Sequence, residues 1–442
     1  AVPPQNIYKT VVDNANSENM GILKNMKKYR ARQIFIPGGL PTFTYNPRIN
    51  LKLEDNLEDA KDFLCKLVMM TGSTKSGKTV LTNKVFPKEE SIWFDGGSYS
   101  NETEFWLDIV EQLNAFTDKS ESTGTDKTSG THMDGGVDGQ FVLFKVKGSG
   151  GISDQKKKSK SQTASRTGNP KTIALQSLRK SNKPLIIDDF HYLPRDHQGI
   201  IVRAVKALIF EGLPVVFIAI PHRRLDAVKV EREMTGRIEA ITVPPWEKHE
   251  LKEIPAKGFP LLNIKISDEI IEDLAQQAIG SPHLMQEFCR EICELNGVRE
   301  TLDTEVEIKN LDLTKLYQNV SQNTGKIIFD KLSKGPRQRS DRLQRKLVNG
   351  TIVDIYGLVL HALANLRPGL DTIDYESLRA AIREVSDESQ PQAHEVTRVL
   401  DKMSQIAASD ESSTPVIDWE KEDRILHITD PFFAFYLRWG IN

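Results

Sequence analysis

The sequence predicts an α/β fold in which helices cover a parallel sheet, and three features indicate it. A glycine-rich loop, GSTKSGKT (Gly72–Thr79), lies between an apolar strand (Leu64–Thr71) and a helix that begins near Val80. A second apolar strand, Leu185–Ile187, ends in two aspartates. An amphipathic helix separates it from a third apolar strand, Leu213–Pro221. Strands and helices that alternate in this way form a parallel sheet in an αβα arrangement.

The glycine-rich loop matches the complete Walker A pattern (P-loop) of phosphate-binding proteins. Its glycines allow a tight turn, so that backbone N–H groups and the positive end of the following helix face an anion. Lys78 is expected to reach the β- and γ-phosphates, and Thr79 to supply a hydroxyl to Mg²⁺. We therefore predict that the chain binds ATP with Mg²⁺. The predicted nucleotide contacts in this segment are Gly72, Ser73, Thr74, Lys75, Ser76, Gly77, Lys78, Thr79 and Val80.

The two aspartates after the second strand are the expected partners of the loop. In P-loop ATPases the first carboxylate of such a pair holds the water shell of Mg²⁺ and the second polarises the attacking water. Asp188 is accordingly predicted to act with Thr79 at the metal, and Asp189 to act as the catalytic base beside Lys78. Two acids after a strand are otherwise often a solvated turn, but the complete P-loop favours the catalytic interpretation.

Composition limits the other classes of function. The chain has 442 residues, enough for about three domains, and its 59 basic and 61 acidic side chains leave a formal charge of -2. No overall field therefore favours nucleic acid or an anionic membrane. No apolar run approaches the roughly 20 residues of a membrane helix. The three cysteines suit a reducing compartment, so a cytoplasmic location is expected, and Cys289 and Cys293 are expected to pack in a core.

Four segments resemble AAA+-like P-loop ATPases of the STAND group, which overlap with origin-recognition and archaeal ATPases. They are the P-loop, the IIDD strand end, GRIEAITVPPWEKHEL (Gly236–Leu251) and IGSPHL (Ile279–Leu284). The resemblance implies an ATPase core that is joined to a helical lid. It also implies that the GxP turn of the lid contacts the nucleotide, here through Pro282 and His283.

The same resemblance implies further roles for charged residues. Arg237 is the leading candidate for an arginine finger, with Arg232 second, although a helix-end salt bridge is an equal alternative for Arg237. His283 stands where many AAA+ proteins have a sensor arginine, which predicts slow turnover. TYNPRINLKLEDNL (Thr44–Leu57) resembles the segment that lies over the adenine in STAND relatives, so Arg48 is predicted to contact the nucleotide.

The predicted domains follow from these patterns. They are an N-terminal arm and nucleotide-covering segment (1–57), the ATPase core (58–245), the lid (246–325), and a basic segment with a winged helix (326–442). Residues 117–170 are predicted to be a flexible insertion in which Gln140–Gly148 forms a hairpin arm that serves assembly. The winged helix is predicted because three helical patterns precede two short strands with a polar turn.

Two functions remain open from the sequence. The first is an ATP-dependent switch that forms homo-oligomers and signals to a separate effector protein, as STAND proteins do in prokaryotic defence against phage. The second is a DNA-loading or DNA-remodelling ATPase of the origin-recognition or transposition-regulator type. The predicted contacts with nucleic acid are Lys334, Arg337, Arg339, Arg342, Arg345 and Lys346. An exposed basic helix without a ligand is the alternative for that segment.

Overall fold

A computed structural model describes most of the chain, and it forms two compact units. The described residues are 27–62, 65–99, 101–115, 118–122, 161–165, 169–220, 234, 236–336, 342–408 and 415–441. The sheet unit lies within Leu53–Thr71 and Thr82–Thr242, and the lid unit within Ala1–Lys52, Gly72–Leu81 and Val243–Asn442. None of the helices in the described ranges is long and apolar enough to cross a membrane.

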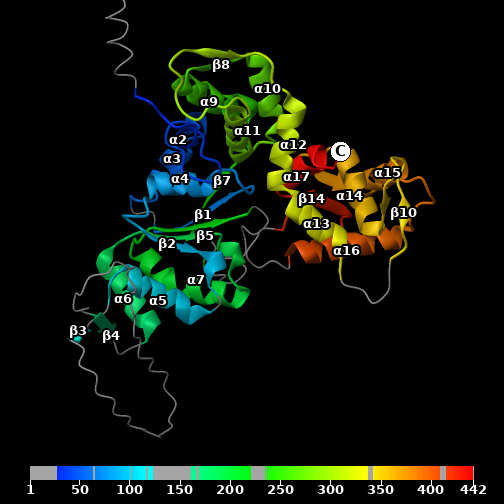
Figure 1. Cartoon of the computed structure of the whole chain (residues 1–442). Coiled ribbons are helices and arrows are strands. Elements are labelled where there is room, and N and C mark those ends of the chain that lie inside the picture. Colours follow the sequence, from blue (N-terminus) through cyan, green and yellow to red (C-terminus); the bar gives the residue numbers. More distant parts are fainter. Residues whose placement is uncertain are drawn as a thin grey trace, which may run out of the picture. The chain divides into compact units, whose positions relative to one another are not determined.

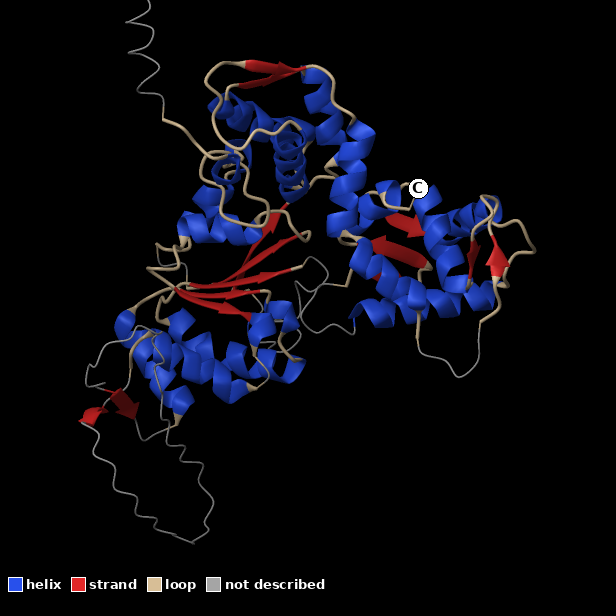
Figure 2. Ribbon diagram, in the orientation of Figure 1, coloured by secondary structure: helices blue, strands red, loops and turns tan. Residues whose placement is uncertain are grey.

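The sheet unit contains a five-stranded sheet, whose strands are the red arrows at its centre in Figure 2. The strand order is β2-β5-β6-β1-β7. The pairs β2·β5, β5·β6 and β6·β1 are parallel, which confirms the predicted parallel sheet. One strand, β6, separates the strand that leads into the P-loop from the strand that ends in the aspartates. The strands are β1 (Leu67–Gly72), β2 (Ile92–Asp95), β5 (Leu185–Asp188), β6 (Val215–Ala219) and β7 (Ile238–Val243).

Three helices pack on this sheet and complete its core (Figure 1). They are α5 (Glu102–Gln112), α6 (Pro170–Ser181) and α7 (Arg195–Phe210). Phe105 and Trp106 of α5 are almost fully buried against strand residues. Helix α6 was not predicted, although Asn169 caps it by accepting hydrogen bonds from two backbone N–H groups in its first turn.

The insertion after α5 contains a strand pair. β3 (Asp118–Ser122) pairs antiparallel with β4 (Ser161–Ser165), where the sequence predicted only flexible linker. Both strands consist almost entirely of polar residues, so they show no apolar alternation by which a strand could have been recognised. The predicted hairpin arm at Gln140–Gly148 lies outside the described residues.

The lid part of the second unit is mainly helical, as predicted. Its core includes Cys289 and Cys293, which are buried as expected. The short helix α2 (Ala31–Ile34) of the N-terminal segment packs into the same core, and the N–H of Ala31 donates to the carbonyl of Arg299. The other lid elements are α9 (Lys248–Gly258), β8 (Ile264–Ile266), α10 (Asp268–Gln277), α11 (Pro282–Leu295), β9 (Val306–Ile308) and α12 (Leu313–Thr324).

The C-terminal part has the element order of a winged helix, which confirms that prediction. Three helices and a three-stranded sheet with the order β12-β14-β13 share one core. Strand β12 was missed because it has only three residues. The elements are α13 (Lys326–Lys334), β10 (Arg345–Lys346), β11 (Ile352–Val353), α14 (Ile355–Asn365), β12 (Thr372–Asp374), α15 (Tyr375–Val385), α16 (Ala393–Ala408), β13 (Ile417–Glu420), β14 (Ile425–Ile428) and α17 (Pro431–Trp439).

The terminal helix α17 belongs to both the lid core and the winged-helix core. Phe433 packs in the winged helix, whereas Phe435 lies 5.1 Å from Phe288 of α11, centroid to centroid. Tyr317 of α12 also contacts α17, with its ring 4.8 Å from that of Trp439. Lid and winged helix are therefore joined by one shared helix, in which Phe433 and Phe435 are fully buried.

Candidate functional site

The P-loop begins where β1 ends and leads into α4 (Lys78–Val85). Gly77 has φ +93° and Lys75 φ +60°, both in the left-handed region. Only glycine adopts the first value without strain, which explains why the motif requires it there. At Gly72 an added Cβ would come within 2.7 Å of the Val243 carbonyl oxygen, so the close approach of β7 requires the other glycine.

The side chains of the loop point to an anion-binding function. Lys78 is buried, and its Nζ donates to the carbonyl oxygens of Gly72 (2.9 Å) and Ser73 (2.8 Å). The hydroxyl oxygens of Thr74 and Ser76 are buried without a hydrogen-bond partner among the described residues. Buried hydroxyls normally have partners, so these two are available to a ligand. With the N–H groups at the start of α4, this loop fits the phosphate groups of a nucleotide.

A second lysine of the loop contacts the C-terminal helix. Lys75 Nζ lies 2.7 Å from Asp430 Oδ2 and 4.2 Å from the centroid of the Phe432 ring. Asp430 also accepts a hydrogen bond from the N–H of Phe433, so it is the N-cap of α17. We call Lys75, Asp430 and Phe432 the clasp. Phe432 is only half-buried, with the Lys75 ammonium over its ring.

The predicted lid turn lies next to the clasp. His283 makes an edge-on contact with Phe432, with 4.7 Å between ring centroids, and its Nε2 is 3.8 Å from a carboxylate oxygen of Glu287. An added Cβ at Gly38 would come within 3.0 Å of the His283 ring. Pro282 is the first residue of α11, which Ser281 caps. His283 and Pro282 thus lie among elements that contact the P-loop, and their nucleotide contacts remain predictions.

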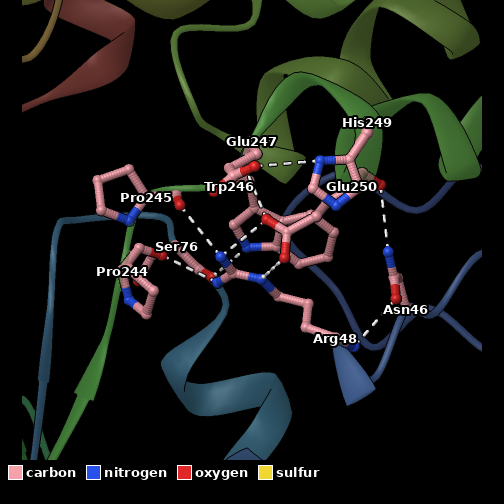
Figure 3. A network of polar contacts seen from close by, with 9 residues as sticks. All are labelled: Asn46, Arg48, Ser76, Pro244, Pro245, Trp246, Glu247, His249 and Glu250. Carbon is pink, nitrogen blue, oxygen red and sulfur yellow. Dashed lines mark hydrogen bonds and ion pairs between the residues drawn. The ribbon is translucent and has the colours of Figure 1, made fainter. Parts of the chain in front are cut away.

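Arg48 contacts protein groups with both ends of its guanidinium (Figure 3). Its Nε and Nη2 donate to the two carboxylate oxygens of Glu250 at 2.9 and 2.8 Å. Its Nη1 donates to the carbonyl of Pro244, and Nη2 also donates to that of Pro245. The guanidinium lies 5.0 Å from the ring centroid of Trp246, whose Nε1 donates to the carbonyl oxygen of Ser76 in the P-loop at 2.9 Å.

We call Arg48, Glu250 and Trp246 the brace. The side chains of Arg48 and Glu250 are 4% and 10% exposed. Burial raises the pKa of the Glu250 carboxyl, but hydrogen bonds from Arg48 and from the backbone of Glu247 outweigh it and hold the pKa below its ordinary value. These N–H donors of Arg48 all bind protein groups, so the structure does not present them to a nucleotide. Protein contacts hold the side chain in place, and its predicted contact with a nucleotide remains a prediction.

The acidic pair lies at the end of β5, as predicted. Asp188 and Asp189 are both half-buried, and the N–H of Asp189 donates to Asp188 Oδ1 at 3.0 Å. Asp189 has φ +49°, and an added Cβ at Gly96 would collide with its carbonyl. Asp95, at the end of β2, pairs in register with Asp188. Because parallel strands have their carboxyl ends at one edge, β1 and β5 both end at the same edge of the sheet.

Arg237 lies at the opposite end of the strands. Its carbonyl accepts a hydrogen bond from the N–H of Leu67, the first residue of β1. Its guanidinium is 5.8 Å from the ring of Phe210, which is 68% exposed. The six residues of β1 span about 20 Å. The arginine-finger role of Arg237 remains a prediction, and the second candidate, Arg232, lies outside the described residues.

Three of the six predicted contacts with nucleic acid lie beside acidic side chains of the chain itself. Arg342 forms an ion pair with Asp354 at 2.6 Å and lies over the Tyr356 ring. Lys346 pairs with Asp387 at 3.0 Å. Arg345 is buried, 4.0 Å from Glu395. Lys334 is the last residue of α13, and Arg337 and Arg339 lie outside the described residues.

The described residues offer few side chains that could bind a metal ion. No set of three or more His, Cys, Asp or Glu side chains arranged to hold a metal ion occurs in the described part of the chain. Mg²⁺ commonly takes one or two protein oxygens beside substrate phosphates, and the predicted roles of Thr79 and Asp188 as its ligands remain predictions.

The elements of the chain itself show an α/β P-loop fold that consists of a parallel sheet, a helical lid and a winged helix. No protein-family model matches it, and neither does the sequence of any curated protein. Solved structures are similar at low identity. A Walker-type ATPase of Pyrococcus abyssi has 14% identity, a TM-score of 0.47, and coverage of 87% of this chain and 94% of that chain.

Two further solved structures show the range of this likeness. The Aeropyrum pernix Orc1 protein, solved in complex with DNA, has 12% identity and a TM-score of 0.43, and the match covers 92% of this chain and 95% of that chain. A STAND protein of Pyrococcus horikoshii with a tetratricopeptide repeat sensor has 13% identity and a TM-score of 0.32, with 86% of this chain and 41% of that chain covered.

Sequence reasoning missed three residues that contact the P-loop or flank it. Trp246, Asp430 and Phe432 are more than 150 residues from the loop in sequence. Trp246 lies in the Pro-Pro-Trp segment that was recognised only as a connection to the lid. The Asp-Pro start of α17 is an ordinary helix N-terminus by pattern, so nothing local revealed its partner, Lys75.

Proposed function

We propose that the protein is an ATP-binding, slowly hydrolysing switch in which the winged helix restrains the P-loop. The observation that carries this proposal is the clasp, because Lys75 of the phosphate-binding loop is paired with a carboxylate of the C-terminal helix. ATP brings phosphate charge to the same loop. Asp430 and the phosphates carry the same sign, so tight ATP binding and a closed clasp disfavour each other.

The remaining predicted residues have roles that follow from this proposal. The P-loop residues from Gly72 to Val80 would hold the phosphates, and Thr79 and Asp188 would hold Mg²⁺, which supplies charge neutralisation for phosphoryl transfer. Asp189 would act as base for the attacking water. His283, next to Phe432, would link the lid turn to the clasp, and Arg237 would act on a neighbouring copy in a homo-oligomer.

ATP would then favour the open clasp and assembly of the chain with copies of itself, and hydrolysis would restore the closed form. A separate effector protein is part of this proposal, as in prokaryotic defence against phage, and the predicted site of action is the cytoplasm. The DNA-loading alternative has less support, because the described basic residues Arg342, Arg345 and Lys346 already face acidic partners.

Mass photometry with ADP, ATP and a non-hydrolysable ATP analogue tests the switch. The parent is expected to be monomeric with ADP and to assemble with the analogue. Lys78→Ala, which removes the phosphate-binding ammonium, is expected to stay monomeric in all three states. Asp430→Asn is expected to assemble at lower analogue concentration. If the parent is monomeric with all three nucleotides, ATP-dependent assembly is contradicted.

A DNA titration at 50 and 200 mM salt separates the two functions. A loader would bind duplex DNA with an affinity that falls steeply with salt and drops on replacing Arg337 and Arg339. The switch proposal expects no such salt-dependent binding, and ATP-dependent assembly in the absence of DNA.

A further inference from the structure

The brace fixes one particular peptide group of the P-loop. Trp246 Nε1 donates to the carbonyl oxygen of Ser76 at 2.9 Å, and the backbone N–H of Trp246 donates to the carbonyl of Gly280 in the lid turn. Trp246 is therefore held by the lid turn through its backbone and holds the P-loop through its indole. All three segments belong to the lid unit.

The hydrogen bond to the Ser76 carbonyl also fixes the orientation of the next N–H group, because a peptide group is planar and trans. The carbonyl of Ser76 and the N–H of Gly77 belong to the same peptide and point in opposite directions. When Trp246 holds the oxygen, the N–H of Gly77 must point away from the indole. Backbone N–H groups of this part of a P-loop are the ones that receive phosphate oxygens.

The charged part of the brace keeps the indole in place. Arg48 donates to both oxygens of Glu250 and to the carbonyls of Pro244 and Pro245, which directly precede Trp246. Glu250 in turn accepts from the backbone N–H of Glu247, so it also caps α9. Arginine alone among the side chains can serve a carboxylate and two carbonyls at once from one rigid plane.

The backbone of the N-terminal segment is shaped for this contact. Arg48 has φ +52°, a left-handed conformation that is uncommon for a residue with a side chain. The side chain of Asn46 stabilises it, because Oδ1 accepts from the N–H of Arg48 at 3.0 Å and Nδ2 donates to the carbonyl of Glu250 at 3.2 Å. A left-handed residue whose side chain binds one carboxylate and two backbone carbonyls indicates a requirement for that side chain at this position.

We propose that Arg48, Glu250 and Trp246 are positioning residues that orient the Ser76–Gly77 peptide of the P-loop for phosphate binding. This inference rests on the proposed nucleotide-binding function, and it assigns Arg48 a role through Trp246 instead of a contact with the base. Nucleotide affinity then depends on a hydrogen bond that the nucleotide does not touch.

Trp246→Phe tests the inference, because it removes the indole N–H and keeps an aromatic ring beside Arg48. Its dissociation constants for ADP and ATP are expected to rise about five- to tenfold, the factor that one such hydrogen bond is worth. Turnover at saturating ATP is expected to stay near the parent value, since the contact serves binding and not the chemical step. Hydrogen exchange of the Gly72–Thr79 peptide is expected to become faster even without nucleotide.

Trp439→Phe is the matched control. It also removes an indole N–H, which donates to Gln277 Oε1 at 3.1 Å in the same unit but not to the P-loop. It is expected to leave affinity and P-loop exchange unchanged. Arg48→Lys keeps the charge but loses the planar fork, and it is expected to change both readouts in the same direction as Trp246→Phe.

Two results would separate failure of this inference from failure of the proposed function. If the parent binds nucleotide and Trp246→Phe matches it in affinity and in P-loop exchange, the brace does not position the loop. If the parent binds no nucleotide, the proposed function fails, and exchange alone decides: faster exchange in Trp246→Phe supports the brace, and unchanged exchange overturns it.

Discussion

The brace and the clasp both hold the P-loop, but they differ in burial and in the number of contacts. The brace pairs a 4% exposed arginine with a 10% exposed glutamate through two hydrogen bonds, and two proline carbonyls take further donors. The clasp has one ion pair, in which the side chains of Lys75 and Asp430 are 27% and 6% exposed, and one contact of the Lys75 ammonium with the Phe432 ring.

Because of this difference, we expect the brace to stay closed and the clasp to open more readily. Opening the brace would leave a charge unpaired in the interior, which is costly. Opening the clasp would release a lysine that already reaches water, whereas the buried Asp430 carboxylate would keep its hydrogen bond from the N–H of Phe433, so the expected cost is smaller than that of opening the brace. Under the proposed function, the lid would hold the loop permanently and the winged helix would restrain it reversibly, which is the asymmetry that a switch requires.

The largest expected effect comes from breaking the brace at Arg48. Arg48→Met leaves the Glu250 carboxylate buried without its partner and is expected to lower the free energy of unfolding by about 3–5 kcal/mol. Urea denaturation measures it. The double variant Arg48→Met with Glu250→Leu is expected to recover most of this loss, because no charge then stays unpaired. A double variant as unstable as the single one would contradict the assigned pairing.

Changes in the clasp are expected to lower stability less. Two variants of Asp430 separate the contribution of its charge from that of its helix cap. Asp430→Asn keeps an N-cap for α17 and removes the charge, so it is expected to cost about 1 kcal/mol or less. Asp430→Ala also removes the cap and is expected to cost about 1 kcal/mol more. Equal stability of the two variants would mean that Asp430 does not cap α17 in solution.

The smallest effect is a dependence of the brace on pH. The pKa of Glu250 in the folded protein lies below its ordinary value of 4.5, so its charge stabilises the fold above that pH. This stabilisation is expected to be lost as the pH falls below 4.5 and through the depressed pKa. Thermal unfolding of the parent should therefore lose more stability on acidification in that window than Glu250→Gln does. Parallel curves for the two proteins would show that Glu250 does not contribute.

The sequence predicted the parts of this molecule that local patterns encode. The P-loop, the strand before Asp188 and the three helices of the winged helix all followed from apolar periodicity and glycine spacing. The partners of the loop did not follow, because Lys75 and Asp430 are 355 positions apart and each is unremarkable in its own segment. Arg48 was noticed for its resemblance to a nucleotide contact, but only the fold reveals its carboxylate partner.

The most direct test of the account is a calorimetric titration of a non-hydrolysable ATP analogue into the parent, Asp430→Asn and Asp312→Asn. Asp312 caps α12 as Asp430 caps α17, so its variant controls for the loss of a capping carboxylate. Removing the competing charge at Asp430 is expected to tighten binding about fivefold at low salt, and Asp312→Asn is expected to bind like the parent. Unchanged or weaker binding by Asp430→Asn would contradict the claim that the winged helix and ATP compete for the P-loop.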